Sequence, residues 1–263
     1  MVKSSDYKKV DLFIKVRQGD AYMANETSTV NRVEDIYKRG EYMSNNPTWH
    51  VEDSPWKAKQ ILKIIMSNDL HPNTICEIGC GAGEILRQMH SVMGNDISFV
   101  GYETAPAAFE MCLQRKTSRL DYRLGDLLED SSAFFDIVMA VDVIEHVEDY
   151  FSFLRRLKQK AQYKILHIPL DLSAQVVLRV APLKIKRKVV GHIHYFTKDI
   201  AVDMLSDVGY EVIEFFYTSS TFETRGGSAK SRLLSLPRRI GFKFCPDLTV
   251  RAIGGYSLMV LAK

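Results

Sequence analysis

The residues of this sequence best suited to chemistry begin with a glycine-rich run, EIGCGAG, which extends from Glu77 to Gly83. An apolar stretch precedes the run, and a helical pattern follows it. Closely spaced glycines let the backbone turn sharply and approach a ligand with no side chain in between. The N-terminus of the following helix adds unpaired N–H groups and a partial positive charge. The run therefore predicts a loop that binds a nucleotide-like cofactor.

The residue after this loop separates two classes of cofactor. A dinucleotide fingerprint has its last Gly or Ala at the position that Glu84 occupies here. A carboxylate beside a pyrophosphate would repel it. Glu84 therefore favours the ribose and amino-acid part of S-adenosylmethionine over a dinucleotide such as NAD.

Three carboxylates lie near the ends of successive predicted strands. Glu77 could face the cationic amino-acid end of the cofactor. Glu103 lies about 20 residues beyond the loop, where an acid can hold both ribose hydroxyls, and Asp126 could accept a hydrogen bond from the adenine amine. Each acid could instead cap a helix or lie in a solvated loop. Their shared place at the carboxyl edge of the sheet, where open α/β sheets bind ligands, favours the binding role.

Histidines are the candidate bases for removing a proton from a hydroxyl acceptor, because they titrate near neutral pH. His192 and His194 follow the fifth predicted strand, and His146 follows the fourth. His50 lies between the two tryptophans, in a segment that could fold over the cofactor. We expect the catalytic residues among His192, His146 and His194, with a purely structural histidine as the alternative for each.

A metal site is a further alternative. Asp142, Glu145 and His146 have the spacing i, i+3, i+4, which gathers side chains on one face of a helical turn. Two carboxylates and an imidazole could hold a divalent ion that orients a substrate oxygen. The favoured interpretation has no resident metal: Asp142 caps the turn, while Glu145 and His146 line the cofactor pocket.

The elements that must position these residues are short apolar runs that alternate with helical patterns. Most runs are continuously apolar, as expected for strands covered on both faces. The alternation predicts an α/β fold, a mostly parallel sheet with helices on both faces. The last run has no helix after it, so we expect a terminal antiparallel strand. The predicted strands are 74–80, 98–103, 121–126, 135–141, 163–170, 210–218 and 256–262, and the helices that separate them are 82–93, 106–115, 149–162 and 198–208.

Three segments lie outside this alternation. Residues 1–56 are predicted to form an N-terminal helical cap or lid, and residues 57–263 a single domain with insertions at 171–191 and 220–255. Ser54 and Pro55 are typical of the cap and the first residue of a helix.

Taken together, the motifs resemble class I, Rossmann-like S-adenosylmethionine-dependent methyltransferases. The group most similar includes the ubiquinone-biosynthesis O-methyltransferases and small-molecule or sugar methyltransferases. The resemblance covers about residues 57–219 plus the last strand. It implies a seven-stranded sheet whose last strand is antiparallel. The motifs that carry it are EIGCGAGE (77–84), GYE (101–103), GD (125–126), FDIVMAVDVIEHVED (135–149) and HIHYFT (192–197).

The resemblance also implies which residues bind the cofactor and which reaction follows. Enzymes of this family that methylate amino groups of DNA bases or protein glutamine often carry an Asn/Asp/Ser-Pro-Pro-Tyr/Phe motif after the fourth strand, and this chain does not. We therefore expect O-methylation of a small-molecule hydroxyl on a sugar, a polyprenyl quinol precursor or a natural product. The residues expected at the cofactor are Glu77, Gly79, Cys80, Gly81, Gly83, Glu103, Thr104, Gly125, Asp126, Leu127, Val141 and Asp142.

Composition limits the partners and the compartment. The 263 residues carry a net charge of +3, which is too weak to indicate a nucleic-acid partner. No apolar stretch reaches the ~18 residues of a transmembrane helix. The four cysteines form no Cys-x-x-Cys pair, which favours a reducing, cytoplasmic location. The sequence leaves the oligomeric state open, with a homodimer as one alternative.

Basic residues are concentrated in the two insertions, where they could meet an anionic or lipid-linked substrate or form solvated faces. Two other functions stay open. An NAD-dependent oxidoreductase shares the glycine loop and the acid beyond it, and a non-catalytic S-adenosylmethionine-binding protein would keep the cofactor site without catalysis. The basic residues are Lys184, Lys186, Arg187, Lys188, Arg225, Lys230, Arg232, Arg238 and Arg239.

Overall fold

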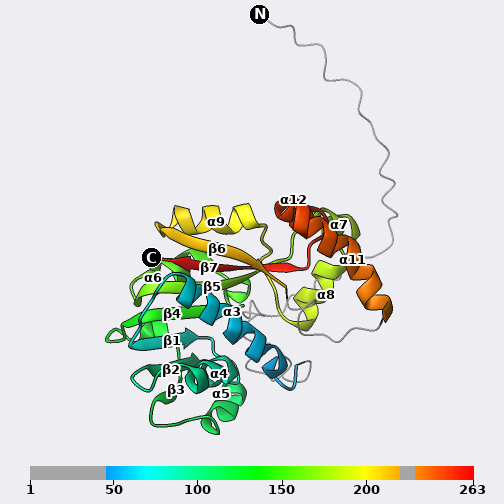
Figure 1. The fold of residues 1–263 in the computed structure, drawn as a ribbon. Coiled ribbons are helices and arrows are strands. Elements are labelled where there is room, and N and C mark those ends of the chain that lie inside the picture. Colours follow the sequence, from blue (N-terminus) through cyan, green and yellow to red (C-terminus); the bar gives the residue numbers. More distant parts are fainter. Residues whose placement is uncertain (1–45, 220–228) are drawn as a thin grey trace, which may run out of the picture. The chain divides into compact units, whose positions relative to one another are not determined.

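The computed structural model describes residues 46–219 and 229–263, without the side chains of residues 229–235. Its strands form one seven-stranded sheet (Figure 1). They are β1 (Thr74–Ile78), β2 (Ser98–Glu103), β3 (Leu120–Leu124), β4 (Phe135–Val141), β5 (Ala161–Leu170), β6 (Val212–Thr218) and β7 (Tyr256–Ala262). The predicted N-terminal cap lies mostly outside the described residues.

The strand order is β3-β2-β1-β4-β5-β7-β6. The pairs from β3 to β5 are parallel, whereas β7 runs antiparallel to both β5 and β6. The order in which the chain adds strands reverses between β1 and β4, which lie side by side in parallel. Open α/β sheets bind ligands at such a switch point. The predicted Rossmann-like sheet with an antiparallel last strand is confirmed.

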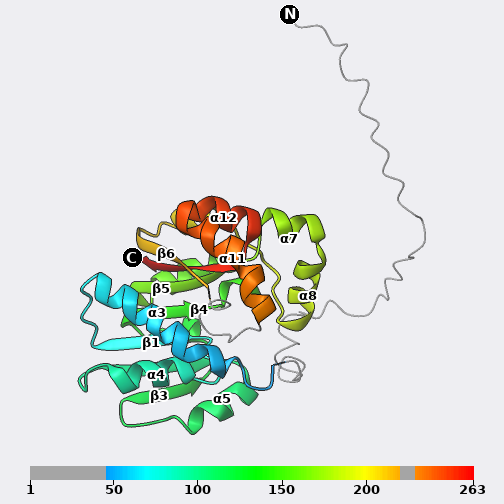
Figure 2. The ribbon, with the colours of Figure 1, turned by 45° about the vertical axis from the view of Figure 1, so that its right-hand side comes forward.

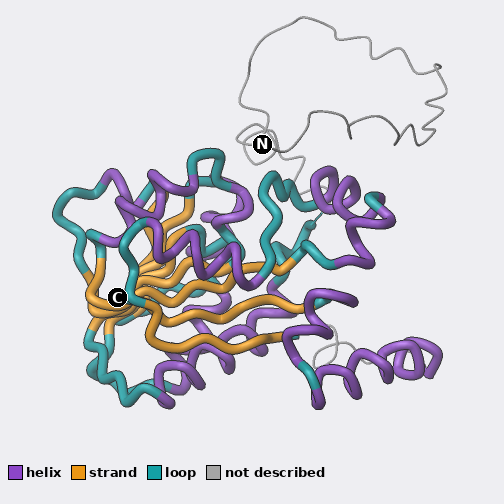
Figure 3. The backbone as a smooth tube through the Cα atoms, turned by 90° about the horizontal axis from the view of Figure 1, so that it is seen from above, coloured by secondary structure: helices purple, strands orange, loops and turns teal. Residues whose placement is uncertain are grey.

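Helices cover both faces of the sheet (Figure 3). On one face, α3 (Ser54–Ser67), α4 (Glu84–Val92) and α5 (Pro106–Leu113) contribute to one apolar core. On the other face, α6 (Tyr150–Lys158) and α9 (Lys198–Asp207) contribute to a second core. The continuous apolar runs of the sequence follow from this arrangement, because every residue of a strand covered on both faces meets a core.

Strand β4 shows the alternation in detail. Ile137 and Met139 belong to the core with α3 and α4. Val138 and Ala140 belong to the core with α6 and α9. Successive side chains of a strand point to opposite faces, so this one run of sequence holds both layers of helices to the sheet.

Several boundaries differ from the predictions by one or more residues, and two of these differences have a clear local cause. Ser54 is the first residue of α3 and not its cap, because the 3₁₀ turn η1 (Val51–Asp53) leads directly into the helix and Ser54 already has helical angles. The helix predicted over 149–162 ends at Lys158, because β5 begins at Ala161 and adds two residues to the predicted strand.

The two insertions are helical where they are described. Residues 171–191 contain α7 (Ala174–Arg179) and α8 (Ala181–Val189), and α11 (Ala229–Phe244) and α12 (Pro246–Ile253) precede β7. Figure 2 shows these four helices grouped beyond the carboxyl end of β5, and α12 contacts both α7 and α11. None of the described helices is both long and apolar enough to span a membrane.

Candidate active site

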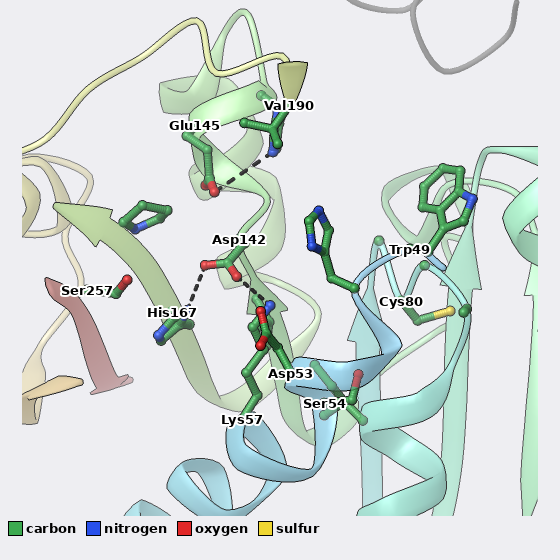
Figure 4. Close-up of a pocket in the computed structure, with 18 of the residues that line it drawn as sticks. Trp49, Asp53, Ser54, Lys57, Cys80, Asp142, Glu145, His167, Val190 and Ser257 are labelled. Atoms are coloured by element: carbon green, nitrogen blue, oxygen red, sulfur yellow. Dashed lines mark hydrogen bonds and ion pairs between the residues drawn. The ribbon is translucent and has the colours of Figure 1, made fainter. Parts of the chain in front are cut away.

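A cavity of about 470 Å³ opens where β1, β2, β4 and β5 end. The glycine loop after β1 forms one wall, and the first turn of α3 with the segment before it forms another (Figure 4). Helix α8 contributes Ile185, Lys186 and Val189 from the insertion. The sheet therefore brings strand ends that are far apart in sequence to one site.

The glycine loop has a conformation that other residues would disturb. Gly79, Gly81 and Gly83 have φ angles of 66°, 55° and 75°. A Cβ atom on Gly83 would lie 2.4 Å from the ring of Tyr122, whose hydroxyl donates to the Gly83 carbonyl at 2.7 Å. Since positive φ favours glycine, these three positions fix the shape of the loop and leave its backbone open to a ligand.

Glu77 is a buried acid on the floor of this cavity. Its Oε2 has no hydrogen-bond partner among the described residues. Burial raises the pKa of Glu77 well above its ordinary value, and the charge of Lys57 opposes this only in part. A carboxyl group in that state gains from a cationic partner, so Glu77 suits the ammonium group of an amino acid.

Glu103 joins the glycine loop to the end of β2. Its Oε2 accepts a hydrogen bond from the Gly81 N–H, and its Oε1 accepts one from the Ala105 N–H, both at 2.7 Å. Burial raises the pKa of Glu103, while these N–H groups oppose the rise. The carboxylate is therefore held at the cavity wall in one orientation, as a group that binds a diol must be.

Asp142 is paired with His167 and Lys57 and does not belong to the candidate metal cluster of the described residues (Figure 4). Its carboxylate is 2.6 Å from His167 Nδ1 and 2.7 Å from Lys57 Nζ. Burial disfavours the charge of Asp142, but His167 and Lys57 outweigh it and hold its pKa well below the ordinary range. The residue has a φ of 55°, an angle that Asp tolerates better than most residues. The network fixes the end of β4 to β5 and to α3.

His192 also lines the cavity, and its ring is hydrogen-bonded to Asp171. Its Nδ1 is 2.6 Å from Asp171 Oδ2, and the other oxygen of Asp171 pairs with Lys186 of α8. Burial disfavours the charge of Asp171, but His192 and Lys186 lower its pKa. An ionised Asp171 accepts a hydrogen bond from the Nδ1–H group of His192. The Nε2 atom of the ring is then unprotonated and can accept a proton.

His146 is less suited to the role of base. It lines the same cavity, and its Nδ1 lies 3.1 Å from the Gly191 carbonyl. Burial and the neighbouring His192 lower its pKa to about 4. At neutral pH its imidazole therefore has little affinity for a proton.

The residues that could hold a metal ion are Glu145, His146 and His192, whose ligand atoms lie within 4.8 Å of one another. Both carboxylate oxygens of Glu145 are buried, without a hydrogen bond to the described residues. The turn η3 (Ile144–His146) brings Glu145 and His146 to the cluster. Asp142 points to Lys57 and His167 and is replaced in this trio by His192.

Several expected site residues lie outside the cavity lining. Asp126 is the N-cap of the turn η2 (Leu127–Glu129), where its Oδ1 accepts from the Leu128 N–H at 2.8 Å. His194 has its Nε2 3.2 Å from the Glu148 carbonyl. The expected residues that line the cavity are Glu77, Gly79, Cys80, Gly81, Glu103, Val141, Asp142, His146 and His192, whereas Gly83, Thr104, Gly125, Asp126, Leu127 and His194 do not.

Glu84 lies at the edge of the cavity with its charge paired. Its carboxylate is 2.5 Å from an Arg87 nitrogen and 2.8 Å from Arg115 Nε. Burial disfavours its charge, but these arginines and Gln88 lower its pKa to about 2. The acid that separated two cofactor classes in the sequence is thus ionised and joins α4 to Arg115, which follows α5.

Three residues of the site were missed from the sequence: Lys57, His167 and Asp171. His167 interrupts the apolar run of β5, and a lone polar residue in a buried strand is a usable signal. Asp171 directly follows β5, in the place that Glu103 has at the end of β2. Lys57 gave no such signal, because one lysine on an amphipathic helix is ordinary.

Comparison with known proteins shows the family to which this chain belongs. A family model described as a methyltransferase domain matches residues 50–215. A ubiquinone biosynthesis O-methyltransferase of Azorhizobium caulinodans is 39% identical over 87 residues, 31% of this chain and 33% of that protein. A mitochondrial ubiquinone biosynthesis O-methyltransferase of Schizosaccharomyces pombe is 29% identical over 145 residues, 51% of this chain and 52% of that protein. The chain thus spans from a third to about half the length of these relatives.

A solved structure shares the fold. The magnesium protoporphyrin IX methyltransferase of Synechocystis PCC 6803, crystallised with bound SAH, has a TM-score of 0.53 and is 14% identical. The match covers 90% of this chain and 89% of that one. At this identity the likeness concerns the fold alone.

Proposed function

Because the chain belongs to the family of methyltransferase domains, we propose that it transfers the methyl group of S-adenosylmethionine to a hydroxyl oxygen of a small molecule. The observation that carries the proposal is a single cavity that joins the glycine loop, Glu77 and Glu103 to an oriented histidine, His192. The relatives' name, O-methyltransferase, supports oxygen as the acceptor atom.

The cofactor fits the residues that line the cavity. Glu77 offers a buried carboxyl oxygen without a hydrogen bond to the described residues. A Cβ on Gly79 would come within 3.0 Å of Val143, so the close approach of backbone to ligand depends on glycine there. Glu103 is held by two N–H groups at the wall. We assign Glu77 to the ammonium group and Glu103 to the ribose hydroxyls, and the SAH found in the solved relative supports this donor.

His192 provides the proton acceptor that an alcohol or phenol needs. When bound, the cofactor supplies an electrophilic methyl group. Such a displacement requires an aligned oxygen and removal of its proton, but no acid for the leaving group. His192 Nε2 takes that proton, while the hydrogen bond from Nδ1 to Asp171 holds the ring in place. Asp171 thereby stabilises the imidazolium that forms.

The segment after β4 supports oxygen over nitrogen. Residues 141–147 read VDVIEHV and contain no proline, whereas family members that methylate amines often carry a proline-containing motif at this place. Asp142 is committed to Lys57 and His167. Asp142 is therefore not available to accept hydrogen bonds from an amine acceptor.

The same proposal covers the organisation of the chain. We assign residues 171–191 and 220–255 to the acceptor side, as insertions of one domain, and residues 1–56 to an N-terminal cap. The four cysteines are free thiols, which fits a reducing, cytoplasmic compartment. A homodimer is kept as an alternative assembly.

Methyl transfer to a panel of acceptors tests the proposal. The full chain is incubated with methyl-labelled S-adenosylmethionine and catechols, sugars and other hydroxyl compounds, and labelled products are identified by mass spectrometry. We expect label on oxygen, and its loss in His192→Gln. Label on nitrogen or carbon would contradict O-methylation, and oxidation of the panel with NAD would indicate the rival oxidoreductase.

A further inference from the structure

A second cavity, of about 270 Å³, lies beside the first among the inserted helices. Helices α7 and α8 form one side of it, and the junction of α12 with β7 forms the other. Figure 2 shows these elements next to one another beyond the end of β5. The inserted helices thus build most of this cavity, together with the end of β5 and the start of β7.

The two cavities share part of their walls. Pro169, Lys186 and Ser257 line both of them. Asp171 lines the second cavity, and the His192 that it binds lines the first. The second cavity is therefore adjacent to the first on the side of His192, as a binding site for the acceptor needs to be.

The charges of the second cavity are predominantly positive. Arg179, Lys186 and Arg238 line it, and Asp171 is the one acid among its described lining residues. Lys186 and Asp171 pair with each other. Arg179 donates from Nε to the Gln175 carbonyl at 3.3 Å, a neutral partner. Three basic side chains thus line this cavity, against one acid among its described lining residues.

The backbone at Gly255 passes close to the guanidinium group of Arg238. Gly255 has a φ of 85°, and a Cβ there would lie 3.3 Å from Arg238 Nη1. The glycine lets the chain pass close to the guanidinium group at the start of β7. Arginine matches the geometry of carboxylate and phosphate groups through paired N–H donors.

The rest of the lining is largely apolar. Leu170, Val176, Leu183 and Ile253 contribute aliphatic side chains, and Tyr256 contributes a ring. Binding sites for small molecules combine such a lining with a few placed polar groups. The apolar wall accommodates a hydrocarbon or aromatic body, and the arginines accommodate an anionic end.

We propose that the second cavity binds the methyl acceptor, and that the acceptor is an amphipathic molecule with a carboxylate or phosphate group. This inference rests on the proposed function, since it places the acceptor's hydroxyl beside His192. The anionic group lies toward Arg179 and Arg238, the apolar body lies along α7 and α12, and the reactive hydroxyl reaches the first cavity past Lys186 and Ser257.

Calorimetric titration of the full chain with two matched probes tests the inference. The probes are 4-phenylbutyrate, an amphipathic anion, and 4-phenylbutanol, its neutral counterpart. We expect the acid to bind about tenfold more tightly than the alcohol, the ratio expected for a charge-assisted pair. The double variant R179Q/R238Q should remove this preference, and Val176→Trp, which fills the cavity, should weaken both probes.

The control is R187Q/R239Q, which removes the same charge from two exposed arginines that line neither cavity. It should keep the preference for the acid. Equal binding of acid and alcohol, no detectable binding of the acid, or an equal loss in the control would overturn the inference. None of the substituted residues lines the first cavity, so each variant should still bind SAH. A separate titration with SAH checks this. A failure to bind SAH would count against the proposed function, while the probe preference is measured with and without SAH.

Discussion

At the scale of single residues, His192 depends on Asp171 for its orientation and tautomer. The hydrogen bond between them is 2.6 Å long and buried, and Lys186 pairs with the same carboxylate. His146 and Glu145 face His192 from η3, with His192 Nε2 3.9 Å from Glu145 Oε1. His192 therefore has one firm partner, Asp171, at Nδ1, while its Nε2 lies near the Glu145 carboxylate.

Asp171→Asn should lower kcat/KM by roughly 10- to 100-fold, mainly through kcat, because an amide can reverse the ring's tautomer. Asp171→Glu should restore part of the rate. Nitrogen-15 NMR of the His192 ring should show the proton moving from Nδ1 in the Asn variant. An unchanged ring spectrum together with an unchanged rate would mean that Asp171 has only a structural role.

Glu77 links cofactor binding to proton release. Burial raises its pKa in the empty pocket, so it holds a proton at pH values where a solvated Glu is ionised. A cofactor ammonium group beside it lowers that pKa again. SAH binding should therefore release protons at pH values above the ordinary pKa of a glutamate, measured by calorimetry in buffers of different ionisation enthalpy.

The matched variants for this proton release are Glu77→Gln and Glu103→Gln. The first should abolish the release and weaken SAH binding about 10- to 100-fold, since a hydrogen bond to a charged group is lost. The second should weaken binding but keep the release, because the Glu103 carboxylate is already stabilised by two N–H groups. Identical heats in all buffers for the unmodified chain would contradict the role of Glu77.

Removal of divalent metal should leave the rate of methyl transfer unchanged, because we propose that His192 acts as a base and not as a metal ligand. The measurement is the transfer rate after dialysis against EDTA, with and without added Mg²⁺. Loss of activity that Mg²⁺ restores would assign Glu145, His146 and His192 to an ion instead.

At the scale of elements, the glycine loop and α4 were predictable because local rules control them. Positive φ angles and a helix start leave a signature in a few adjacent residues. The cap helices α7, α8 and α11 were not predicted as helices. No side chain of α7 or α8 is buried, and the basic run LKIKRK (183–188) made this segment resemble a charged insertion. Pro237 inside α11 also hides that helix from a sequence pattern.

Gly83→Ala should disturb the loop. The added Cβ would lie 2.4 Å from the Tyr122 ring, and the alanine would have to adopt a φ of 75°. We therefore expect a loss of about 1–3 kcal/mol of stability and weaker SAH binding. Gly209→Ala is the control, because its φ is 80° but its nearest neighbour is the mobile end of Lys158. Urea unfolding and SAH titration measure both effects. Equal SAH affinity in the two variants would show that the loop does not need its observed shape.

At the scale of the whole molecule, the sheet was predictable and the site only in part. Continuous apolar runs gave β2, β4 and β7 their bounds, because burial on both faces dominates their composition. Glu77 and Glu103 were found because they lie at the carboxyl ends of strands, and His192 because it comes after the fifth strand. Lys57, His167 and Asp171 act through partners distant in sequence, and a tertiary contact of that kind has no local pattern.

Removing residues 256–263 should prevent folding. Strand β7 lies between β5 and β6, and residues 258–262 are fully buried. At about 1.5–3 kcal/mol for each large apolar side chain, their loss is comparable to the whole stability of a typical domain, about 5–15 kcal/mol. Circular dichroism should show no cooperative unfolding, whereas the volume-conserving control Met259→Leu should unfold cooperatively. A cooperative transition in the truncated chain would contradict this role for β7.

The central claim is that the cavity at the ends of β1, β2, β4 and β5 binds S-adenosylmethionine. The most direct test is calorimetric titration of the full chain with SAH and, separately, with NAD. The account predicts saturable one-to-one binding of SAH, weakened in Glu77→Gln, and no heat of binding with NAD. Saturable binding of NAD without binding of SAH would contradict it.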